Sequence, residues 1–455
     1  MAGITQAREA AFKILLAVER GKAHADDLLR GRAVSALSQQ DRNLATTLVM
    51  GVLRWQLLLD QHLKRFLTKP GARLDAEVLI ALRLGAFQLL YLDRIPAHAA
   101  IGESVELTKQ AGHRFAAGMV NAVLRKIGIE PKGPLDVEAG VEAEQAHPEW
   151  LVDRWKNFYG NEIARAICLH GQRQSELAVR LADWAAEREL TDAGVGLAPG
   201  RLLADARIVT AGDVSAIEAF RVGRVRIQDE GSQLVAEVAA GLSLDRGLVE
   251  RVKGIVDACA APGGKTMILA ERNPQALIVA CESSPQRLAV MKKRVAAFGD
   301  RIECRLADVT ELNESAIYDV ALVDAPCSGT GTLGRNPEIR HRTHVEDLAR
   351  QAERQKAILQ AAIRSLRPGG HIVYSTCSLE PEENEQVADD VLSETPNLRR
   401  IPIAERIDAL REAEIVTPEG AERLRECITS EGALRLIPGA LGTDGFFVSV
   451  FEKKP

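Results

Sequence analysis

From about residue 250 to the C-terminus, the chain alternates short apolar segments with longer amphipathic ones. The apolar segments are GIVDAC, ALIVACE, RIECRLAD, YDVALVDAP and GHIVYSTC. Short apolar strands separated by amphipathic helices are typical of a parallel sheet that has helices on both faces. The alternation therefore predicts an open, mostly parallel, doubly wound sheet.

The C-terminal end departs from this alternation. The segments ALRLIPG and DGFFVSVFEKK lie close together across a Gly-rich turn, which predicts a β-hairpin. A mostly parallel sheet that ends in an antiparallel strand is the usual outline of class I, Rossmann-like methyltransferases. We therefore expect residues 246–455 to form a domain of this class.

The rest of the chain is long enough for two further domains, since 455 residues correspond to about three domains of about 150 residues. Residues 1–132 carry apolar side chains at helical spacing, which predicts an all-α bundle. The Pro- and Gly-containing stretch 128–140 predicts a linker. Residues 146–245 contain the strand-like segments ELAVRLAD, RLLADARIV and RVRIQD and predict a small α+β domain. The predicted fold class is thus multidomain, α and α/β.

Charge is unevenly distributed along the chain. Residues 1–133 hold 19 Lys and Arg against 12 Asp and Glu, a charge of +7 in a protein whose net charge is −5. The N-terminal third is therefore the better candidate for contact with a phosphate backbone. An ordinary solvated helical surface would have a similar charge.

The cysteines and the apolar segments bear on the cellular compartment. No apolar stretch approaches the ~18 residues of a membrane span, and the N-terminal segment lacks the core of a signal peptide. The seven cysteines are scattered and form no C-x-x-C pair. We expect reduced thiols in a cytoplasmic, metal-free protein that does not associate with membranes, with a monomer as the default state.

The loop after the first predicted strand has the composition of a ligand-binding turn. The segment DACAAPGGKTMILAE, residues 257–271, predicts a strand, a loop of small residues and a helix, so a ligand can approach the backbone at the helix N-terminus. A dinucleotide motif is absent, and a P-loop would need glycine where Cys259 stands. The remaining class is S-adenosylmethionine, whose amino-acid end can lie along such a loop. The candidate cofactor-binding residues are Cys259, Ala260, Ala261, Pro262, Gly263, Gly264 and Lys265.

Acidic residues end the next two predicted strands. Glu282 could accept hydrogen bonds from both ribose hydroxyls, and Asp308 could accept one from the adenine amino group. Either acid alone could be an ordinary solvated residue. Because the carboxyl ends of parallel strands lie at one edge of a sheet, the two acids and the loop together indicate a binding crevice.

Cysteines occur at the ends of the following two strands. Cys327 follows Asp324, Ala325 and Pro326, and Cys377 lies in STCSLEPEENE. A buried cysteine is often inert, but two at one sheet edge indicate chemistry. The C5 carbon of a pyrimidine has no lone pair, and attack of a thiolate on C6 makes C5 nucleophilic. Asp324 could then hydrogen-bond N3 or the amino group of the base and stabilise the developing charge.

These motifs resemble a known family. DACAAPGGKT, DAPCSGTGTLGRNPEIR and YSTCSLEPEENE are similar to the signature motifs of the NOL1/NOP2/Sun family of RNA 5-methylcytosine methyltransferases. The N-terminal segments AREAAFKILLAVE, DRNLATTLVMGVLR and LRLGAFQLLYLDRIPAHAAIGESVELTK resemble the NusB-like RNA-binding domain. The combination is similar to the family members that methylate 16S ribosomal RNA. The resemblance implies transfer of a methyl group from S-adenosyl-L-methionine to C5 of a cytosine in unassembled or partly assembled 16S RNA.

The resemblance also implies roles for individual residues. Cys377 would be the nucleophile, and Cys327 would help to release the methylated product. Residues 259–265 would line the cofactor, with Glu282, Asp308 and Asp324 as polar contacts.

Four basic residues near these motifs are further candidates. Arg287 could approach the cofactor or be an exposed helix residue. Lys265 lies in the first helical turn, where the helix dipole disfavours a cation, so it is expected to have a local partner or a role in the catalytic site. The two arginines of RNPEIR, residues 335–340, could contact the RNA backbone or belong to a structural loop.

Two other functions are compatible with parts of the sequence. An amino-methyltransferase carries a loop of the form D-P-P-Y, which DAPC resembles superficially, but the aromatic residue that stacks the base is missing. A non-catalytic, NusB-like RNA-binding scaffold would not need the thiols and cofactor acids that are intact in this chain.

Overall fold

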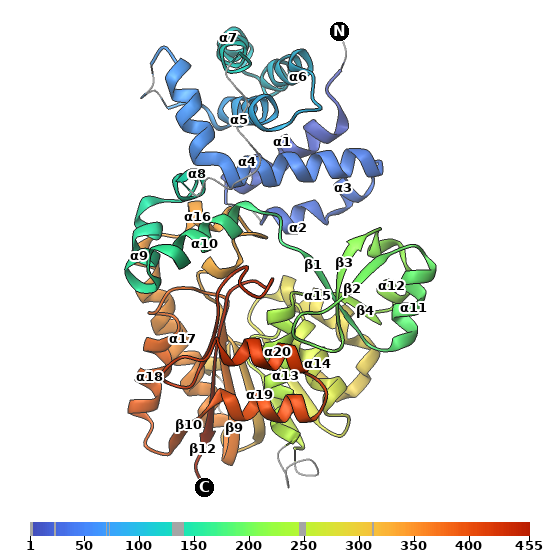
Figure 1. Cartoon of the computed structure of the whole chain (residues 1–455), viewed down its shortest axis with the longest axis vertical. Helices are drawn as coiled ribbons and strands as arrows, with labels where there is room; N and C mark the ends of the chain where they lie inside the picture. The colour runs from blue at the N-terminus through green and yellow to red at the C-terminus, as the bar shows by residue number, and fades with distance from the viewer. Residues whose placement is uncertain are drawn as a thin grey trace. The chain divides into compact units, whose positions relative to one another are not determined.

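The computed structural model describes residues 3–21, 24–69, 71, 73–129, 141–244, 252–311 and 314–455. Most of the predicted linker, residues 128–140, lies outside these ranges. Contacts divide the chain into two compact units (Figure 1). Unit 1 comprises Met1–Gln174 and Leu333–Arg342, and unit 2 comprises Ser175–Thr332 and Thr343–Pro455. The three predicted domains, residues 1–132, 146–245 and 246–455, remain a prediction. The contacts define two units and do not test the boundaries between three domains.

Unit 1 is helical, which confirms the predicted bundle. The central helix is α5 (Ala76–Tyr91), which has 13 of its 16 residues buried. A helix that is apolar on all sides must be covered on all sides, and α5 packs against α1, α4, α6 and α7. The other helices are α1 (Gln6–Glu19), α2 (Ala25–Leu29), α3 (Arg32–Ser35), α4 (Gln39–Phe66), α6 (Ala97–Gln110), α7 (Ala117–Ile127), α8 (Val141–Gln145), α9 (Glu149–Tyr159), α10 (Asn161–Gln172) and α16 (Ile339–Arg342).

Unit 2 begins with a small antiparallel sheet. Its strands are β1 (Leu177–Leu181), β2 (Gly196–Pro199), β3 (Ala206–Ala211) and β4 (Val225–Ile227), in the order β2-β3-β1-β4. Helices α11 (Trp184–Asp192) and α12 (Glu218–Arg221) complete a ferredoxin-like β-α-β-β-α-β arrangement. Strands β1, β3 and β4 are those predicted for the small α+β domain, whereas the short β2 was missed. Helices α9 and α10, which lie within the predicted bounds 146–245, group with unit 1.

The large sheet of unit 2 has the predicted mostly parallel form. Its order is β10-β12-β9-β8-β5-β6-β7, and β5 to β9 pair in parallel. Strand β12 is antiparallel to β9 and pairs with β11, which confirms the predicted hairpin. The order reverses at β5, so a crevice is expected at the carboxyl ends of β5 and its neighbours. The strands are β5 (Gly254–Asp257), β6 (Leu277–Glu282), β7 (Ile302–Leu306), β8 (Tyr318–Asp324), β9 (Leu366–Thr376), β10 (Leu398–Ile401), β11 (Leu434–Leu436) and β12 (Phe446–Lys453).

Helices cover both faces of the large sheet. Successive strand residues point to opposite faces, so Ile255 joins the core beneath one set of helices and Val256 joins the core beneath the other. The first set is α13 (Glu230–Ala240), α14 (Gly264–Arg272), α15 (Pro285–Val295), α19 (Ile403–Glu412) and α20 (Pro418–Arg425). The second set is α17 (Val345–Ser365) and α18 (Glu385–Glu394). Among the described residues, no helix has both the length and the apolarity that a transmembrane segment needs.

Candidate active site

The loop after β5 is fixed to both neighbouring strands. Ala258 N–H donates to Leu322 O of β8, and Ala260 N–H donates to Cys281 O of β6, each over 2.9 Å. The loop enters α14 at Gly263, which has φ +100 and where a Cβ atom would lie 3.1 Å from Val295. The backbone conformation therefore favours glycine at this turn, and a larger residue would also crowd Val295.

Asp257, the last residue of β5, is a buried acid that was not among the predicted site residues. Thr266 Oγ1 donates to its Oδ2 over 2.7 Å. Burial raises the pKa of Asp257 to about 6. The signal available in the sequence was its place at the end of the first strand of the sheet.

Glu282 and Arg287 form a pair next to this loop. Glu282 is buried at the end of β6, and its Oε1 accepts from Ser284 N–H over 2.8 Å. Arg287 Nη1 lies 3.2 Å from Glu282 Oε2, and Arg287 Nη2 donates to Ala261 O over 2.7 Å. Although 58% of its side chain is exposed, Arg287 thus connects the strand-end acid to the loop of small residues.

Asp308 follows β7 at the same edge of the sheet. Its Oδ1 accepts from Thr310 N–H over 3.0 Å and from Thr310 Oγ1 over 2.7 Å. These two hydrogen bonds lower the pKa of Asp308, so the carboxylate is charged at neutral pH.

Lys265 and Asp324 form an ion pair between α14 and the end of β8. Lys265 Nζ lies 2.8 Å from Asp324 Oδ2, and Ser375 Oγ donates to Asp324 Oδ1 over 2.9 Å. The ammonium group also lies 5.6 Å from the centre of the Phe446 ring. Burial lowers the pKa of Lys265, but the Asp324 carboxylate more than offsets this effect, and the net pKa is raised. Asp324 is therefore a local partner of Lys265.

Cys327 and Cys377 face each other at the ends of neighbouring strands. Their Sγ atoms are 3.4 Å apart. The contact with Cys377 and burial raise the pKa of the Cys327 thiol well above its usual range, so Cys327 keeps its proton at neutral pH. The structure therefore brings the two predicted thiols together, near the pair of Lys265 and Asp324.

Other cysteines of unit 2 lack this environment. Burial raises the pKa of the Cys259 thiol well above its usual range and that of Cys281 to about 12. Neither thiol is set up to attack as a thiolate. Cys259 therefore contributes to the loop through its backbone and its size.

The loops that carry the two thiols are also joined through their backbones. Gly331 N–H donates to Cys377 O over 2.9 Å, and Gly445 N–H donates to Gly331 O over 2.8 Å. A Cβ atom on Gly331 would lie 2.6 Å from Gly445 O and 2.8 Å from Cys377 O. This close approach of three backbone segments is possible only with glycine at position 331.

The segment after the Cys327 loop belongs to unit 1. Arg340 is 1% exposed, and its guanidinium group donates to Ala146 O over 3.2 Å and to Gly171 O over 2.8 Å. Burial lowers the pKa of Arg340 to about 9, so the group remains charged at neutral pH. Of the two roles considered for RNPEIR, Arg340 has the structural one.

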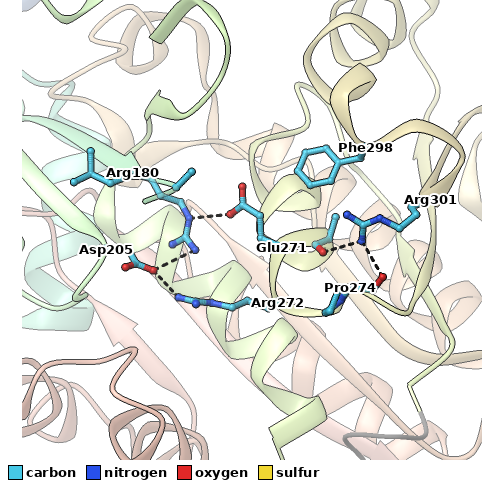
Figure 2. A pocket seen from close by; sticks show the side chains of 10 residues that line it. Arg180, Asp205, Glu271, Arg272, Pro274, Phe298 and Arg301 are labelled. Atoms are coloured by element: carbon cyan, nitrogen blue, oxygen red, sulfur yellow. Dashed lines mark hydrogen bonds and ion pairs between the residues drawn. The ribbon is translucent and has the colours of Figure 1, made fainter. Parts of the chain in front are cut away.

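A separate pocket of about 360 Å³ lies between the small sheet and the end of α14. Figure 2 shows the side chains that line it. Arg180 Nε lies 3.3 Å from Glu271 Oε2, and Arg272 Nη2 lies 2.7 Å from Asp205 Oδ2. Arg272 also pairs with the buried Glu237 over 2.9 Å. The pocket is thus crossed by ion pairs that fix the small sheet to α14, about 13 Å along that helix from the glycine loop. Its lining residues are Arg180, Leu181, Ala182, Asp205, Ala270, Glu271, Arg272, Pro274, Phe298 and Arg301.

The fold and the site together define a class. A sheet that reverses its order at β5, a glycine turn at a helix N-terminus, and acids at the ends of the next two strands are the features of a class I, Rossmann-like methyltransferase. The site suits an S-adenosylmethionine-type cofactor, because the turn lacks side chains where the ligand approaches and Glu282 and Asp308 offer acceptors for hydroxyl and amino groups. Among the described residues, no three His, Cys, Asp or Glu side chains are grouped to bind a metal.

Comparison with known proteins identifies the family. Residues 248–452 match the family described as 16S rRNA methyltransferase RsmB/F, and residues 5–128 match the NusB family. The probable ribosomal RNA small subunit methyltransferase B of Bacillus subtilis is 35% identical to this chain, over 99% of each sequence. The ribosomal RNA small subunit methyltransferase B of Pseudomonas putida is 33% identical, over 98% of each. The chain belongs to the RsmB/F family of 16S rRNA methyltransferases.

Solved structures support the fold. The crystal structure of PH0851 has a TM-score of 0.78 at 23% identity, covering 99% of this chain and all of that one. The structure of NSun6 from Pyrococcus horikoshii with SFG has a TM-score of 0.55 at 19% identity, covering 68% of this chain and 98% of that one. The resemblance inferred from the sequence motifs is therefore confirmed at the level of family and fold.

Proposed function

We propose that this chain transfers a methyl group from S-adenosyl-L-methionine to C5 of a cytosine in RNA, through a covalent bond between Cys377 and C6 of the base. The observation that carries the proposal is the 3.4 Å separation of the Cys327 and Cys377 sulfurs. Both sulfurs lie at the edge of the large sheet that also carries the loop after β5 and the strand-end acids Glu282 and Asp308.

Two thiols at one site suit a carbon acceptor. Oxygen and nitrogen acceptors have lone pairs and need mainly orientation or deprotonation, whereas C5 of cytosine must first be made nucleophilic. Addition of a thiolate to C6 achieves this. The bound cofactor supplies an electrophilic methyl group on its sulfonium sulfur. Afterwards the C5 proton and the enzyme sulfur must both leave the base.

The roles of the two thiols follow from the family resemblance, in which the cysteine of the TCS motif, here Cys377, makes the first attack. Cys327, within 3.4 Å, then assists the elimination that releases Cys377. Asp324, held by Lys265 and Ser375, would contact N3 or the amino group of the cytosine and stabilise the charge that develops on the ring.

The cofactor would be held by residues at three strand ends. Residues 259–265 would lie along its amino-acid portion, Glu282 would accept from the ribose hydroxyls, and Asp308 would accept from the adenine amino group. Arg287 would keep the loop and Glu282 together, since it contacts both.

The description of the matching family favours 16S ribosomal RNA as the substrate, and the relatives' names favour the RNA of the small ribosomal subunit. The NusB match and the charge of +7 over residues 1–133 favour unit 1 as an RNA-binding region. A base can enter the crevice only when it is out of its stack, so a single-stranded or partly assembled RNA is expected. We propose that the reaction takes place in the cytoplasm with a monomeric enzyme.

Two single substitutions test the proposal. Cys377→Ala should abolish methylation, and Cys327→Ala should accumulate an enzyme–RNA adduct that survives denaturing electrophoresis. Cys427→Ala, which removes a thiol outside the two loops that carry Cys327 and Cys377, should behave as the unaltered protein. If Cys327→Ala abolished methylation and Cys377→Ala accumulated the adduct, the assigned roles would be reversed.

Two other results would identify a different function. N6-methyladenine in place of 5-methylcytosine would identify an amino-methyltransferase, and RNA binding without cofactor binding would identify a scaffold.

A further inference from the structure

The two cysteine loops share one carboxylate. Each cysteine is followed by a serine, Ser328 after Cys327 and Ser378 after Cys377. Ser328 Oγ donates to Glu383 Oε2 over 2.5 Å, and Ser378 Oγ donates to the same oxygen. Ser328 N–H donates to Glu383 Oε1 over 2.9 Å. Glu383 is thus hydrogen-bonded directly to Ser328 and Ser378, the residues that follow the two cysteines.

Glu383 also reaches the other side of the Cys327 loop. Gln355 of α17 donates through Nε2 to Glu383 Oε1 over 2.9 Å and to Pro326 O over 3.0 Å. The backbone carbonyl of Glu383 accepts from the hydroxyl of the buried Tyr374 in β9. Both ends of the Pro326–Ser328 stretch are therefore connected to this one residue, directly or through Gln355.

The burial of Glu383 without a counter-ion indicates a role beyond stability. Its side chain is fully buried. No Lys, Arg or His of the described residues forms an ion pair with it, and its side-chain oxygens accept instead from Ser328, Ser378 and Gln355. A carboxylate in such a place is unfavourable unless fully hydrogen-bonded, and apolar groups of similar size would stabilise a core equally well. The arrangement is explained if the position of the two loops matters for the reaction.

We propose that Glu383 is a positioning residue that holds the Cys327 and Cys377 loops in register, so that the second sulfur is in place when the first has bonded to the base. Glu383 acts through Ser328 and Ser378 and need not touch the substrate. The inference rests on the proposed function, because it assumes that Cys327 releases the Cys377 adduct.

Glu383→Gln is the variant that alters the hydrogen bonds with the least change in shape. Glutamine keeps one oxygen to accept from Ser328 N–H and Gln355, but its NH₂ group cannot accept from the two serine hydroxyls. We expect kcat to fall by about 10- to 100-fold, with KM for cofactor and RNA changed by less than about twofold. We also expect a denaturation-resistant enzyme–RNA adduct to accumulate, as with Cys327→Ala. A merely structural role would lower stability without trapping this intermediate.

Matched variants distinguish an error about Glu383 from an error about the proposed function. Glu385→Gln changes an acid two residues away that pairs with Arg435 of β11 and contacts neither serine, so it should not trap an adduct. Cys327→Ala serves as the positive control in the same experiment. An adduct with Cys327→Ala but none with Glu383→Gln would overturn the inference and leave the proposed function intact. Absence of an adduct with Cys327→Ala would overturn the proposed function itself.

A second measurement reports on the spacing of the thiols without RNA. Oxidation by diamide removes two electrons and two protons from the pair and forms one disulfide, which peptide mapping identifies as Cys327–Cys377, while diamide becomes its hydrazine. We expect this disulfide to form at least about fivefold more slowly in Glu383→Gln than in the unaltered chain. An equal rate would count against the inference. If Glu383→Gln does not fold, Ser378→Ala, which removes one of the same hydrogen bonds, takes its place in both measurements.

Discussion

Lys265 Nζ lies 2.8 Å from Asp324 Oδ2, at the point where the loop after β5 and the Cys327 loop meet. Lys265 stands in the first turn of α14, where the helix dipole disfavours a cation. The ion pair compensates for this position and leaves the carboxylate beside the thiols. The finding suggests that Lys265 acts by orienting Asp324 toward the substrate base.

Lys265→Met should therefore slow methyl transfer by roughly 100-fold, the size typical when an electrostatic contact at a reacting centre is removed. The measurement is the rate of incorporation of labelled methyl groups into RNA. If Lys265 acts through Asp324, the double variant Lys265→Met/Asp324→Asn should be no slower than Asp324→Asn alone. Additive losses would show that Lys265 has a role of its own.

Cofactor affinity provides a second prediction. Glu282→Gln should weaken binding of S-adenosyl-L-methionine by at least about tenfold, because a hydrogen bond to a charged group typically contributes about 1.5–3 kcal/mol. Calorimetry with the cofactor alone measures this without RNA. Glu303→Gln, an exposed acid of β7 that pairs with Arg305, is the matched control and should bind normally. Equal affinities of the two variants would remove Glu282 from the cofactor site.

Asp257 leads to a prediction about pH. Its pKa in the folded protein is raised to about 6 from an ordinary value of 3.8. Asp257 is protonated and does not destabilise the folded protein below about pH 4. As pH rises through 6, its ionisation in the buried site lowers the free energy of unfolding. Asp257→Asn carries no titrating proton, so its unfolding temperature should rise relative to the unaltered chain between pH 4 and 7. The gain corresponds to at most about 3 kcal/mol. A difference in unfolding temperature that is constant across this pH range would contradict the prediction.

The sequence predicted the sheet and most strand-end residues of the site because both follow from local patterns. Apolar runs of strand length that end in Glu282, Asp324 or Cys377 place those residues at one edge, since parallel strands share a direction. Glu383 could not be found in this way. It lies within the acidic run EPEENE, which is typical of a solvated surface, and its burial depends on Ser328, 55 residues away. The repeated Cys-Ser pair was the available signal, but its meaning depends on a tertiary contact.

The buried Arg340 distinguishes a structural arginine from an RNA-binding one. Arg340→Met should leave Ala146 O and Gly171 O without their donor and lower the stability of unit 1 by about 2 kcal/mol, part of the loss being offset because a buried cation is also removed. Thermal unfolding measures this loss. Because a 1% exposed guanidinium group cannot contact a phosphate, the slope of log K for RNA against log salt concentration should not change. A slope reduced by about one unit would mean that Arg340 does contact RNA. Lys64→Met is the control for the thermal unfolding measurement. Lys64 is an exposed residue of α4, so this variant removes a cation from the same unit without removing a buried hydrogen bond.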